Sequence, residues 1–173
     1  MAQPMPSASE LLGQRRRVLV TGGAGFIGGA VVRRLLREST AIVFNLDKMG
    51  YASDLTSIEE VLAELGEAGA NRHHLLKIDL SDADAVNAAV READPDLVMH
   101  LAAESHVDRS ISGPGVFIES NVNGTYNLLQ AVRGHYEGLS GERREAFRLH
   151  HISTDAVFGS LGAECRVSET TPY

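Results

Sequence analysis

Short apolar runs alternate with longer segments of helical character along most of the chain, and this alternation limits the possible folds more than any other feature. The apolar runs cover residues 17–21, 41–47, 74–80, 96–103 and 147–154. Strands that are apolar along their whole length and are joined by helices belong to a parallel sheet covered on both faces. The sequence therefore predicts a doubly wound α/β sheet.

The intervening segments predict the helices of this sheet. Residues 25–38, 81–94 and 116–135 place apolar residues at helical spacing, and residues 56–69 are rich in helix formers. Ligands of such a sheet bind beyond the carboxyl ends of the strands. The residues directly after each predicted strand are therefore the candidates for function.

Length and composition are those of one ordered domain: 173 residues, 43% hydrophobic and 23% charged. The first 14 residues are small and polar and precede an Arg run, so we predict a flexible tail over 1–14 and a domain over 15–173. This order of residues is the reverse of a secretory signal, and no run of 18 apolar residues follows. We expect a soluble, cytoplasmic protein.

Charge and cysteine content exclude several classes of protein. The formal net charge of −7 argues against a nucleic-acid-binding or membrane-binding face. Cys165 is the one cysteine, which excludes an internal disulfide and a multi-thiolate metal site. His73 and His74, like His150 and His151, are adjacent in predicted strands and point to opposite faces. We therefore predict no metal site.

A glycine-rich turn, TGGAGFIG, follows the first strand. Gly22 permits a tight turn, Gly25 lets a pyrophosphate approach the backbone, and Gly28 allows close packing of helix on strand. The helix that follows would offer free N–H groups to phosphates. Such a pattern also occurs by chance in loops, but its place between strand and helix favours a Rossmann-type dinucleotide site.

Acidic residues end the second and third strands. Asp47 is placed to accept hydrogen bonds from a ribose diol, and its charge would repel a 2′-phosphate, which favours NAD over NADP. Lys48 offsets part of that repulsion. Asp79 could hold an adenine amino group. The simpler alternatives are that Asp47 caps a loop and that Asp79 begins a turn into Ser81.

Polar groups also gather after the fourth and fifth strands. Glu104, Ser105 and Arg109 follow two small alanines that leave room for a cofactor, although a solvated surface loop could have the same composition. Thr154 and Asp155 could hydrogen-bond a sugar oxygen and deliver a proton to a leaving hydroxyl. The alternative for this pair is a turn in which the threonine hydroxyl caps a helix.

Six segments together resemble the extended short-chain dehydrogenases/reductases and, within them, the dTDP-glucose 4,6-dehydratase family. The resemblance runs from about residue 17 to the last residue, and AAESHVDRS and STDxVxG are its most specific parts. The segments are TGGAGFIG, NLDKMGYASDL, KIDLSD, VMHLAAESHVDRSI, FIESNVNGTYNLLQA and HISTDAVFGSLG.

The resemblance implies tightly held NAD as the cofactor and a nucleotide sugar, dTDP-glucose, as the substrate. It also implies a homodimer through helices near residues 116–135, whose apolar residues we otherwise assign to the core. Thr154 would bind the C4 oxygen of the sugar, Asp155 would protonate the departing C6 hydroxyl, and Ser105 would also approach the substrate. The implied cofactor contacts are Gly22, Gly25, Phe26, Ile27, Gly28, Asp47, Lys48, Met49, Gly50, Asp79, Leu80, Leu101, Ala102, Ala103, Glu104, Ser105 and Ser120.

Two departures from the family pattern bear on activity. Ala156 occupies the position of the carboxylate that should remove the C5 proton, and a methyl group cannot act as a base. The chain also ends at Tyr173, before the Tyr-x-x-x-Lys pair of such enzymes, so we expect a fragment lacking part of the active site. A nucleotide-sugar 4-epimerase, a UDP-sugar dehydratase and a non-catalytic NAD-binding protein therefore remain as alternatives.

Overall fold

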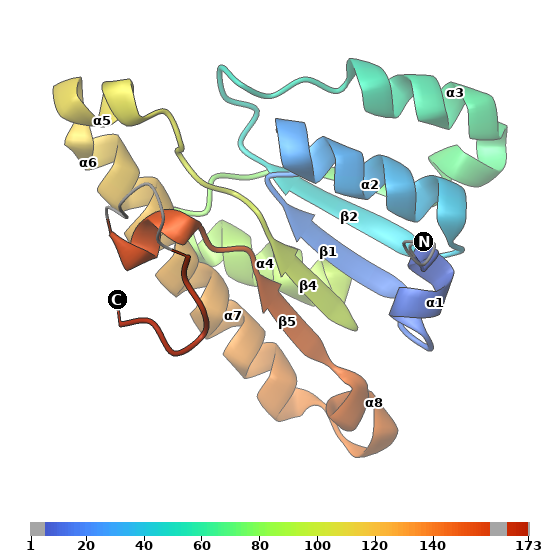
Figure 1. The fold of residues 1–173 in the computed structure, drawn as a ribbon. Helices are drawn as coiled ribbons and strands as arrows, with labels where there is room; N and C mark the ends of the chain where they lie inside the picture. The colour runs from blue at the N-terminus through green and yellow to red at the C-terminus, as the bar shows by residue number, and fades with distance from the viewer. Residues whose placement is uncertain (1–5, 160–165, 173) are drawn as a thin grey trace.

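The computed structural model describes residues 6–159 and 166–172, so Cys165 and Tyr173 lie outside the described residues. Its five strands form one parallel sheet in the order β3-β2-β1-β4-β5 (Figure 1). The predicted doubly wound, Rossmann-type sheet is confirmed. The strands are β1 (Arg17–Thr21), β2 (Ile42–Asp47), β3 (His73–Lys77), β4 (Leu97–His100) and β5 (Arg148–His151).

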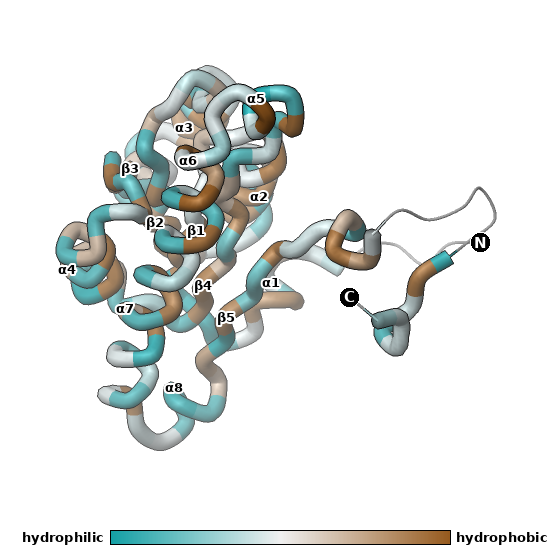
Figure 2. Tube along the Cα trace, turned by 90° about the vertical axis from the view of Figure 1, so that its left-hand side faces the viewer, coloured by the Kyte–Doolittle hydropathy of each residue, from teal (hydrophilic) through white to brown (hydrophobic). Residues whose placement is uncertain are grey.

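Helices cover both faces of the sheet. One layer contains α1, α2 and α3, and the other contains α4 and α7, as the turned view of Figure 2 shows. None of the helices within the described residues has the length and apolar character needed to cross a bilayer. The helices are α1 (Ala8–Leu12), α2 (Phe26–Glu38), α3 (Thr56–Ala70), α4 (Ala83–Ala93), α5 (Val107–Ser112), α6 (Pro114–Phe117), the π-helix η1 (Ile118–Asn123), α7 (Gly124–Gly138), α8 (Gly141–Ala146) and the 3₁₀ helix η2 (Asp155–Phe158).

The core divides into two clusters because successive residues of a strand point to opposite faces. In β1, Val18 and Val20 pack with the α1–α2–α3 layer, whereas Leu19 packs with α4 and α7. All three side chains are fully buried. The central strand is therefore apolar along its length, as a parallel sheet requires, and its carboxyl end at Thr21 is held rigidly.

The structure differs from the flexible tail predicted over residues 1–14. Residues 8–12 form α1, which begins with a capping box: the Ser7 hydroxyl accepts from the Glu10 N–H, and the Glu10 carboxylate accepts from the Ser7 N–H. Ala8 and Leu12 are buried against the α2 side of the sheet. Burial of this short apolar face orders a segment whose composition is that of a tail.

The single helix predicted over residues 116–135 is interrupted. Residues 118–123 form a π-helix between α6 and α7. At the start of α7, Gly124 lies so close to Leu80 that a Cβ would approach the Leu80 Cβ to 2.9 Å.

Most predicted strands also end early, and residues 78–80, 101–103 and 152–154 form loops at the carboxyl edge of the sheet.

Candidate dinucleotide site

The glycine turn after β1 is built by close backbone approaches. Gly22 has a φ of +70°, and a Cβ there would lie 2.7 Å from the backbone of Ala102. A Cβ on Gly28 would overlap the carbonyl group of Gly22. No side chain caps the start of α2 at Gly25, and Phe26 and Ile27 are exposed. The first N–H groups of α2 are thus available to an anion.

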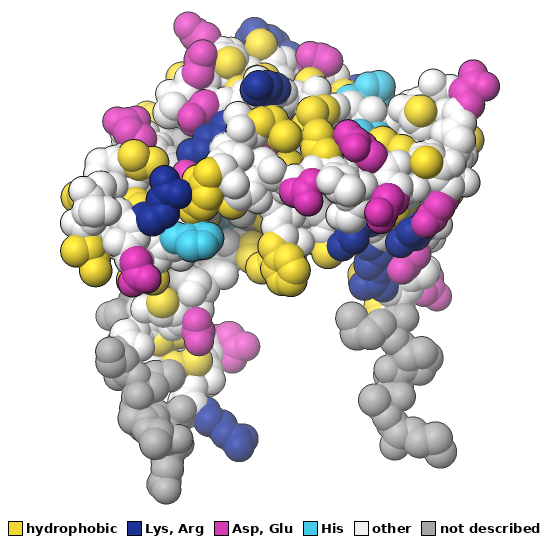
Figure 3. Space-filling model, turned by 90° about the horizontal axis from the view of Figure 1, so that it is seen from above, with side chains coloured by type: hydrophobic (Ala, Val, Ile, Leu, Met, Phe, Trp, Pro, Cys, Tyr) yellow, Lys and Arg dark blue, Asp and Glu magenta, His cyan; other side chains and the backbone are white. Residues whose placement is uncertain are grey.

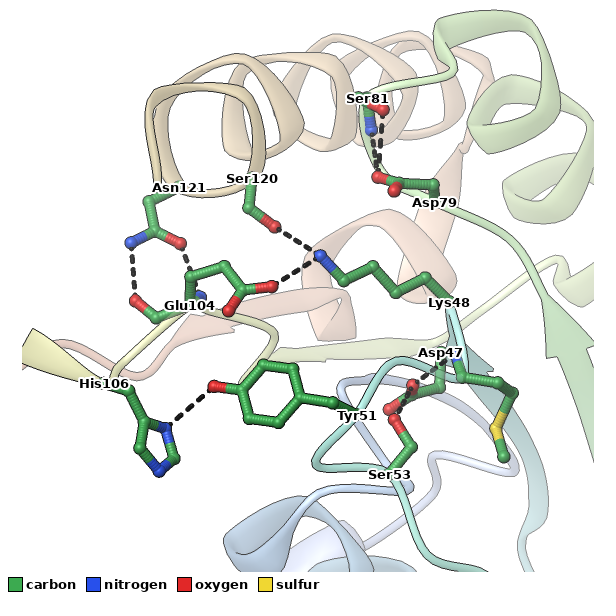
Figure 4. Close-up of polar contacts among 11 residues, drawn as sticks. Asp47, Lys48, Tyr51, Ser53, Asp79, Ser81, Glu104, His106, Ser120 and Asn121 are labelled. Carbon is green, nitrogen blue, oxygen red and sulfur yellow. Dashed lines mark hydrogen bonds and ion pairs between the residues drawn. The ribbon is translucent and has the colours of Figure 1, made fainter. Parts of the chain in front are cut away.

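The Asp47 carboxylate connects the β2 end to this turn. One oxygen accepts from the Ala24 N–H at 3.0 Å, and the other accepts from the Met49 N–H at 2.8 Å and the Ser53 hydroxyl at 2.7 Å (Figure 4). Met49 adopts a left-handed conformation with φ 59°. Asp47 therefore caps the loop that follows β2, which was the simpler of the two expectations. The carboxylate oxygen bonded to Ala24 can still accept a further hydrogen bond, so binding of a ribose diol remains open to it.

A partly buried ion pair joins the segments that follow β2 and β4. Lys48 Nζ lies 2.6 Å from Glu104 Oε1 and donates to the Ser120 hydroxyl at 3.5 Å. The side chain of Asn121 accepts from the Glu104 N–H at 2.8 Å and donates to the Glu104 carbonyl at 2.9 Å. The segments that follow β2 and β4 thus meet the π-helix at one place (Figure 4). Asn121 holds the backbone from which Glu104 projects.

His100, the last residue of β4, is hydrogen-bonded on both sides of its ring and holds the end of this strand against β1 and α7. The Thr21 hydroxyl accepts from the Ala102 N–H at 3.2 Å and lies 2.7 Å from His100 Nδ1, while His100 Nε2 lies 3.0 Å from the Thr125 hydroxyl. Thr21 can therefore donate to Nδ1, and we assign the imidazole proton to Nε2. Burial, with a smaller effect of His151, lowers the pKa of His100 to about 4. The ring is neutral near pH 7.

Asp79 and Leu80 lie after β3. The Asp79 carboxylate accepts from the Ser81 N–H at 2.9 Å and from the Ser81 hydroxyl at 3.0 Å, which is the turn considered as the alternative to adenine binding. Leu80 is 5% exposed and packs in the core with α4 and α7. Its side chain belongs to the core, and only its backbone lies at the sheet edge.

The β5 end is open by comparison. Thr154 Oγ1 accepts from the Ala156 N–H at 3.2 Å and donates to Asp155 at 3.4 Å, so the predicted threonine-capped turn is present. The side chains of Thr154, Asp155 and Ala156 are all exposed. The Ile152 N–H donates to the His100 carbonyl at 3.0 Å, which aligns this segment beside residues 101–103. Proton transfer by Asp155 would require further groups around it.

Most of the expected contacts lie on the carboxyl edge of the sheet, around the glycine turn and the ends of β2 and β4. Seen from above, this end of the molecule mixes acidic, basic and apolar side chains (Figure 3). Sequence reasoning missed three residues that organise it: Thr21, His100 and Asn121. Asn121 lies in a short polar helix among other polar residues, and its partner Glu104 lies 17 residues away, so no local pattern marked it. Within the described residues, no cluster of three or more His, Cys, Asp or Glu could hold a metal ion.

A doubly wound sheet with an uncapped helix start after β1 and an acid at the end of β2 is typical of the Rossmann-type class. The sequence profile of a family described as GDP-mannose 4,6 dehydratase matches residues 19–173. The chain belongs to this family.

Named relatives agree with that membership. The chain is 48% identical over 159 residues to a dTDP-glucose 4,6-dehydratase of Neisseria meningitidis serogroup B, covering 91% of this chain and 43% of the relative. A dTDP-glucose 4,6-dehydratase from Streptomyces venezuelae, solved with NAD, superposes with a TM-score of 0.72 at 37% identity, covering 90% of this chain and 44% of that one. A Thermus thermophilus UDP-glucose 4-epimerase, solved with NAD, superposes with a TM-score of 0.70 at 32% identity, covering 90% of this chain and 43% of that one. The chain thus spans less than half the length of these proteins.

Proposed function

We propose that this chain is the NAD-binding portion of a nucleotide-sugar 4,6-dehydratase acting on dTDP-glucose. The observation that carries the proposal is the 48% identity to a dTDP-glucose 4,6-dehydratase over 91% of the chain. The geometry supports it, because the uncapped start of α2 and the Asp47 carboxylate lie at the ends of adjacent strands. These are the positions of a dinucleotide's pyrophosphate and adenosine ribose.

The residues at the sheet edge fit NAD. The compact turn around Gly22 and Gly28 exposes the helix start to phosphates, and the carboxylate of Asp47 disfavours a 2′-phosphate. Asp79, with the Leu80 backbone, would meet the adenine, and Ser105 would lie near the sugar. The remaining proposed cofactor contacts are Gly25, Phe26, Ile27, Lys48, Met49, Gly50, Leu101, Ala102, Ala103, Glu104 and Ser120.

When held by these residues, NAD would supply the hydride chemistry of the proposed reaction, from the sugar C4 and back to C6. In this proposal the Thr154 hydroxyl holds the C4 oxygen, and Asp155, protonated, donates its proton to the C6 hydroxyl as water leaves. The C5 proton lost in the same step would pass to a base that the described residues do not supply, because Ala156 occupies the expected position. Such an acid needs a raised pKa, which burial beneath the sugar would produce. Since Asp155 is exposed in the described residues, that cover must come from substrate and from other parts of the protein.

Ala156 favours a second candidate, a nucleotide-sugar 4-epimerase. An epimerase does not remove the C5 proton, so it needs no carboxylate at this position, and a UDP-glucose 4-epimerase has nearly the same TM-score as the dehydratase. Asp155 opposes this candidate, because an epimerase has no leaving hydroxyl to protonate. A non-catalytic NAD-binding protein is the third possibility.

We also propose a homodimer through η1 and α7. Ile118, Val122 and Tyr126 are 55%, 55% and 60% exposed, and Leu129 is 45% exposed, so assigning them to the core is wrong for this chain. Leu128 and Val132 of the same helix are buried, so the exposed residues form a separate stripe beside the buried one. Exposed apolar rows of this kind mark association surfaces. Sedimentation should show a dimer that Leu129→Asp converts to a monomer.

The activity test uses the full-length protein with dTDP-glucose and the absorbance that the 4-keto product develops in alkali. Ala156→Glu should raise dehydration by about 10²- to 10⁴-fold by supplying a base. Ala156→Gln, which has the same length but no base, is the matched control. If neither wild type nor Ala156→Glu forms the product, the dehydratase proposal fails. Formation of the C4 epimer would establish the second candidate, and NAD binding without turnover would establish the third.

A further inference from the structure

Two loops meet across the carboxyl end of β1. Strands β2 and β4 are the two neighbours of β1 in the sheet, and the glycine turn follows β1 directly. The loop after β2 contacts the segment after β4 at two points: Lys48 with Glu104, and Tyr51 with His106 (Figure 4). Both links therefore span the end of the strand that carries the candidate pyrophosphate site.

The outer link is centred on the ring of Tyr51. Its hydroxyl lies 2.9 Å from His106 Nδ1, and the two rings meet edge to face with centroids 5.5 Å apart. The guanidinium carbon of Arg109 lies 3.8 Å from the centroid of the same ring. One aromatic side chain from the β2 loop is thus held on two sides by residues that flank the start of α5.

The outer link has no evident part in holding the core together. Tyr51 is 54% exposed and belongs to neither core cluster, and His106 and Arg109 are also exposed. The inner link is different, because the Glu104 side chain is only 10% exposed and its backbone is held by Asn121. An exposed three-residue contact between two loops is weak enough to open and close on its own.

The link lies across the path of the proposed ligand. A dinucleotide with its adenosine at the β2 end and its other half at the β4 end must pass beneath or through a contact that joins those two ends. We propose that Tyr51, His106 and Arg109 form a clasp that must open for a dinucleotide to enter or leave. This inference rests on the proposed function, since it concerns the same site.

The contacts that form the clasp are among its own three residues and do not include the dinucleotide. The clasp should therefore change the rates at which the dinucleotide enters and leaves more than its affinity. Removing it lowers the barrier for entry and exit together. One hydrogen bond and one cation–π contact at an exposed site correspond to about a tenfold change in rate. Tyr51→Ala should therefore raise the association and dissociation rate constants of NADH about tenfold each and change Kd by less than about threefold.

The experiment is stopped-flow NADH fluorescence, with dissociation followed by displacement with excess NAD⁺. Because the chain contains no Trp, the nucleotide's own emission is the signal. Tyr51→Phe keeps the ring beneath Arg109 and loses the bond to His106, so both rates should rise about threefold. Arg109→Ala keeps the bond between Tyr51 and His106 and loses the cation–π contact, so both rates should again rise about threefold. Arg144→Ala is the matched control, because Arg144 lies 4.6 Å over the ring of Tyr136 at the α7–α8 end of the molecule.

The outcomes separate the two proposals. If wild type binds NADH and the Tyr51 and Arg109 variants exchange it at the wild-type rate, the clasp is refuted while the proposed NAD site stands. A faster dissociation with an unchanged association rate, and therefore a weaker Kd, would make Tyr51 a binding contact and would also refute the clasp. If wild type binds neither NADH nor NAD⁺ at millimolar concentration, the proposed function itself fails.

Discussion

The ends of β2 and β5 lie on the same edge of one sheet but differ in how completely they are built. Asp47 is 7% exposed and its carboxylate accepts three hydrogen bonds. Thr154 and Asp155 are exposed, and within the described residues their side-chain hydrogen bonds join only Thr154, Asp155 and Ala156. The comparison indicates that the proposed cofactor half of the site is already organised within the described residues, whereas the proposed catalytic half would require groups that these residues do not supply.

The largest expected effect is that of Gly28→Ala in the organised half. The new methyl group would overlap the carbonyl group of Gly22 and the Cα of Gly23, and backbone cannot move aside as a flexible side chain can. We expect the free energy of unfolding to fall by at least about 4 kcal/mol, together with loss of NAD binding. Urea denaturation followed by circular dichroism measures the change.

Gly134→Ala in α7 is the control for that variant. A Cβ at Gly134 meets nothing within 4 Å, so the substitution should stabilise the helix by about 0.5–1 kcal/mol. If Gly28→Ala were as stable as Gly134→Ala, the packing described for the turn would be incorrect.

The next largest effect concerns the pH dependence of stability through His100. Its pKa is about 4 in the folded protein and near 6.5 when exposed, so the unfolded chain takes up the proton first as the pH falls. The stability that depends on neutral His100 is complete above pH 6.5 and is lost as the pH falls to about 4. At ~1.4 kcal/mol per pKa unit, the loss is roughly 3 kcal/mol.

His100→Gln isolates this contribution. The variant keeps a donor for Thr125 and has no group to protonate, although it should be less stable than wild type at pH 7. Between pH 7 and pH 4 the difference in the free energy of unfolding should shift by about 3 kcal/mol in favour of the variant. Parallel pH profiles for the two proteins would contradict the assignment of a neutral, buried imidazole.

Asp47→Asn tests the β2 end with a smaller expected effect. The amide keeps the size of the carboxylate but turns an N–H group toward one set of donors. We therefore expect the free energy of unfolding to fall by about 2 kcal/mol and NAD binding to weaken. Asp79→Asn is the matched substitution, because within the described part of the chain the Asp79 carboxylate accepts hydrogen bonds only from Ser81, on an exposed turn. It should cost less than about 1 kcal/mol. If the two variants lost the same free energy of unfolding, the conclusion that Asp47 organises the loop after β2 would be wrong.

The sheet and the glycine turn could be predicted because both depend on local patterns. Apolar runs and glycine spacing can be seen within a few residues of sequence, and the capping box of Ser7 and Glu10 would have indicated α1 in the same way. Contacts between distant residues could not be found. Lys48 and Glu104 are separated by 56 residues, and Thr21 and His100 by 79. Such pairs depend on strand order and register, which a single sequence does not specify residue by residue.

The smallest expected effect on stability is that of Asp155→Asn at the open end. Asp155 is exposed and makes one long hydrogen bond of 3.4 Å, so the free energy of unfolding should change by less than about 0.5 kcal/mol. If Asp155 is the acid of the proposed reaction, the same change should lower turnover of dTDP-glucose by the full-length protein by about 10²- to 10⁴-fold. Asp108→Asn, at an exposed acid in α5 with no proposed role, should alter neither quantity. A loss of stability as large as that of Asp47→Asn would show that the β5 end is built as completely as the β2 end, and would remove the distinction between the two halves of the site.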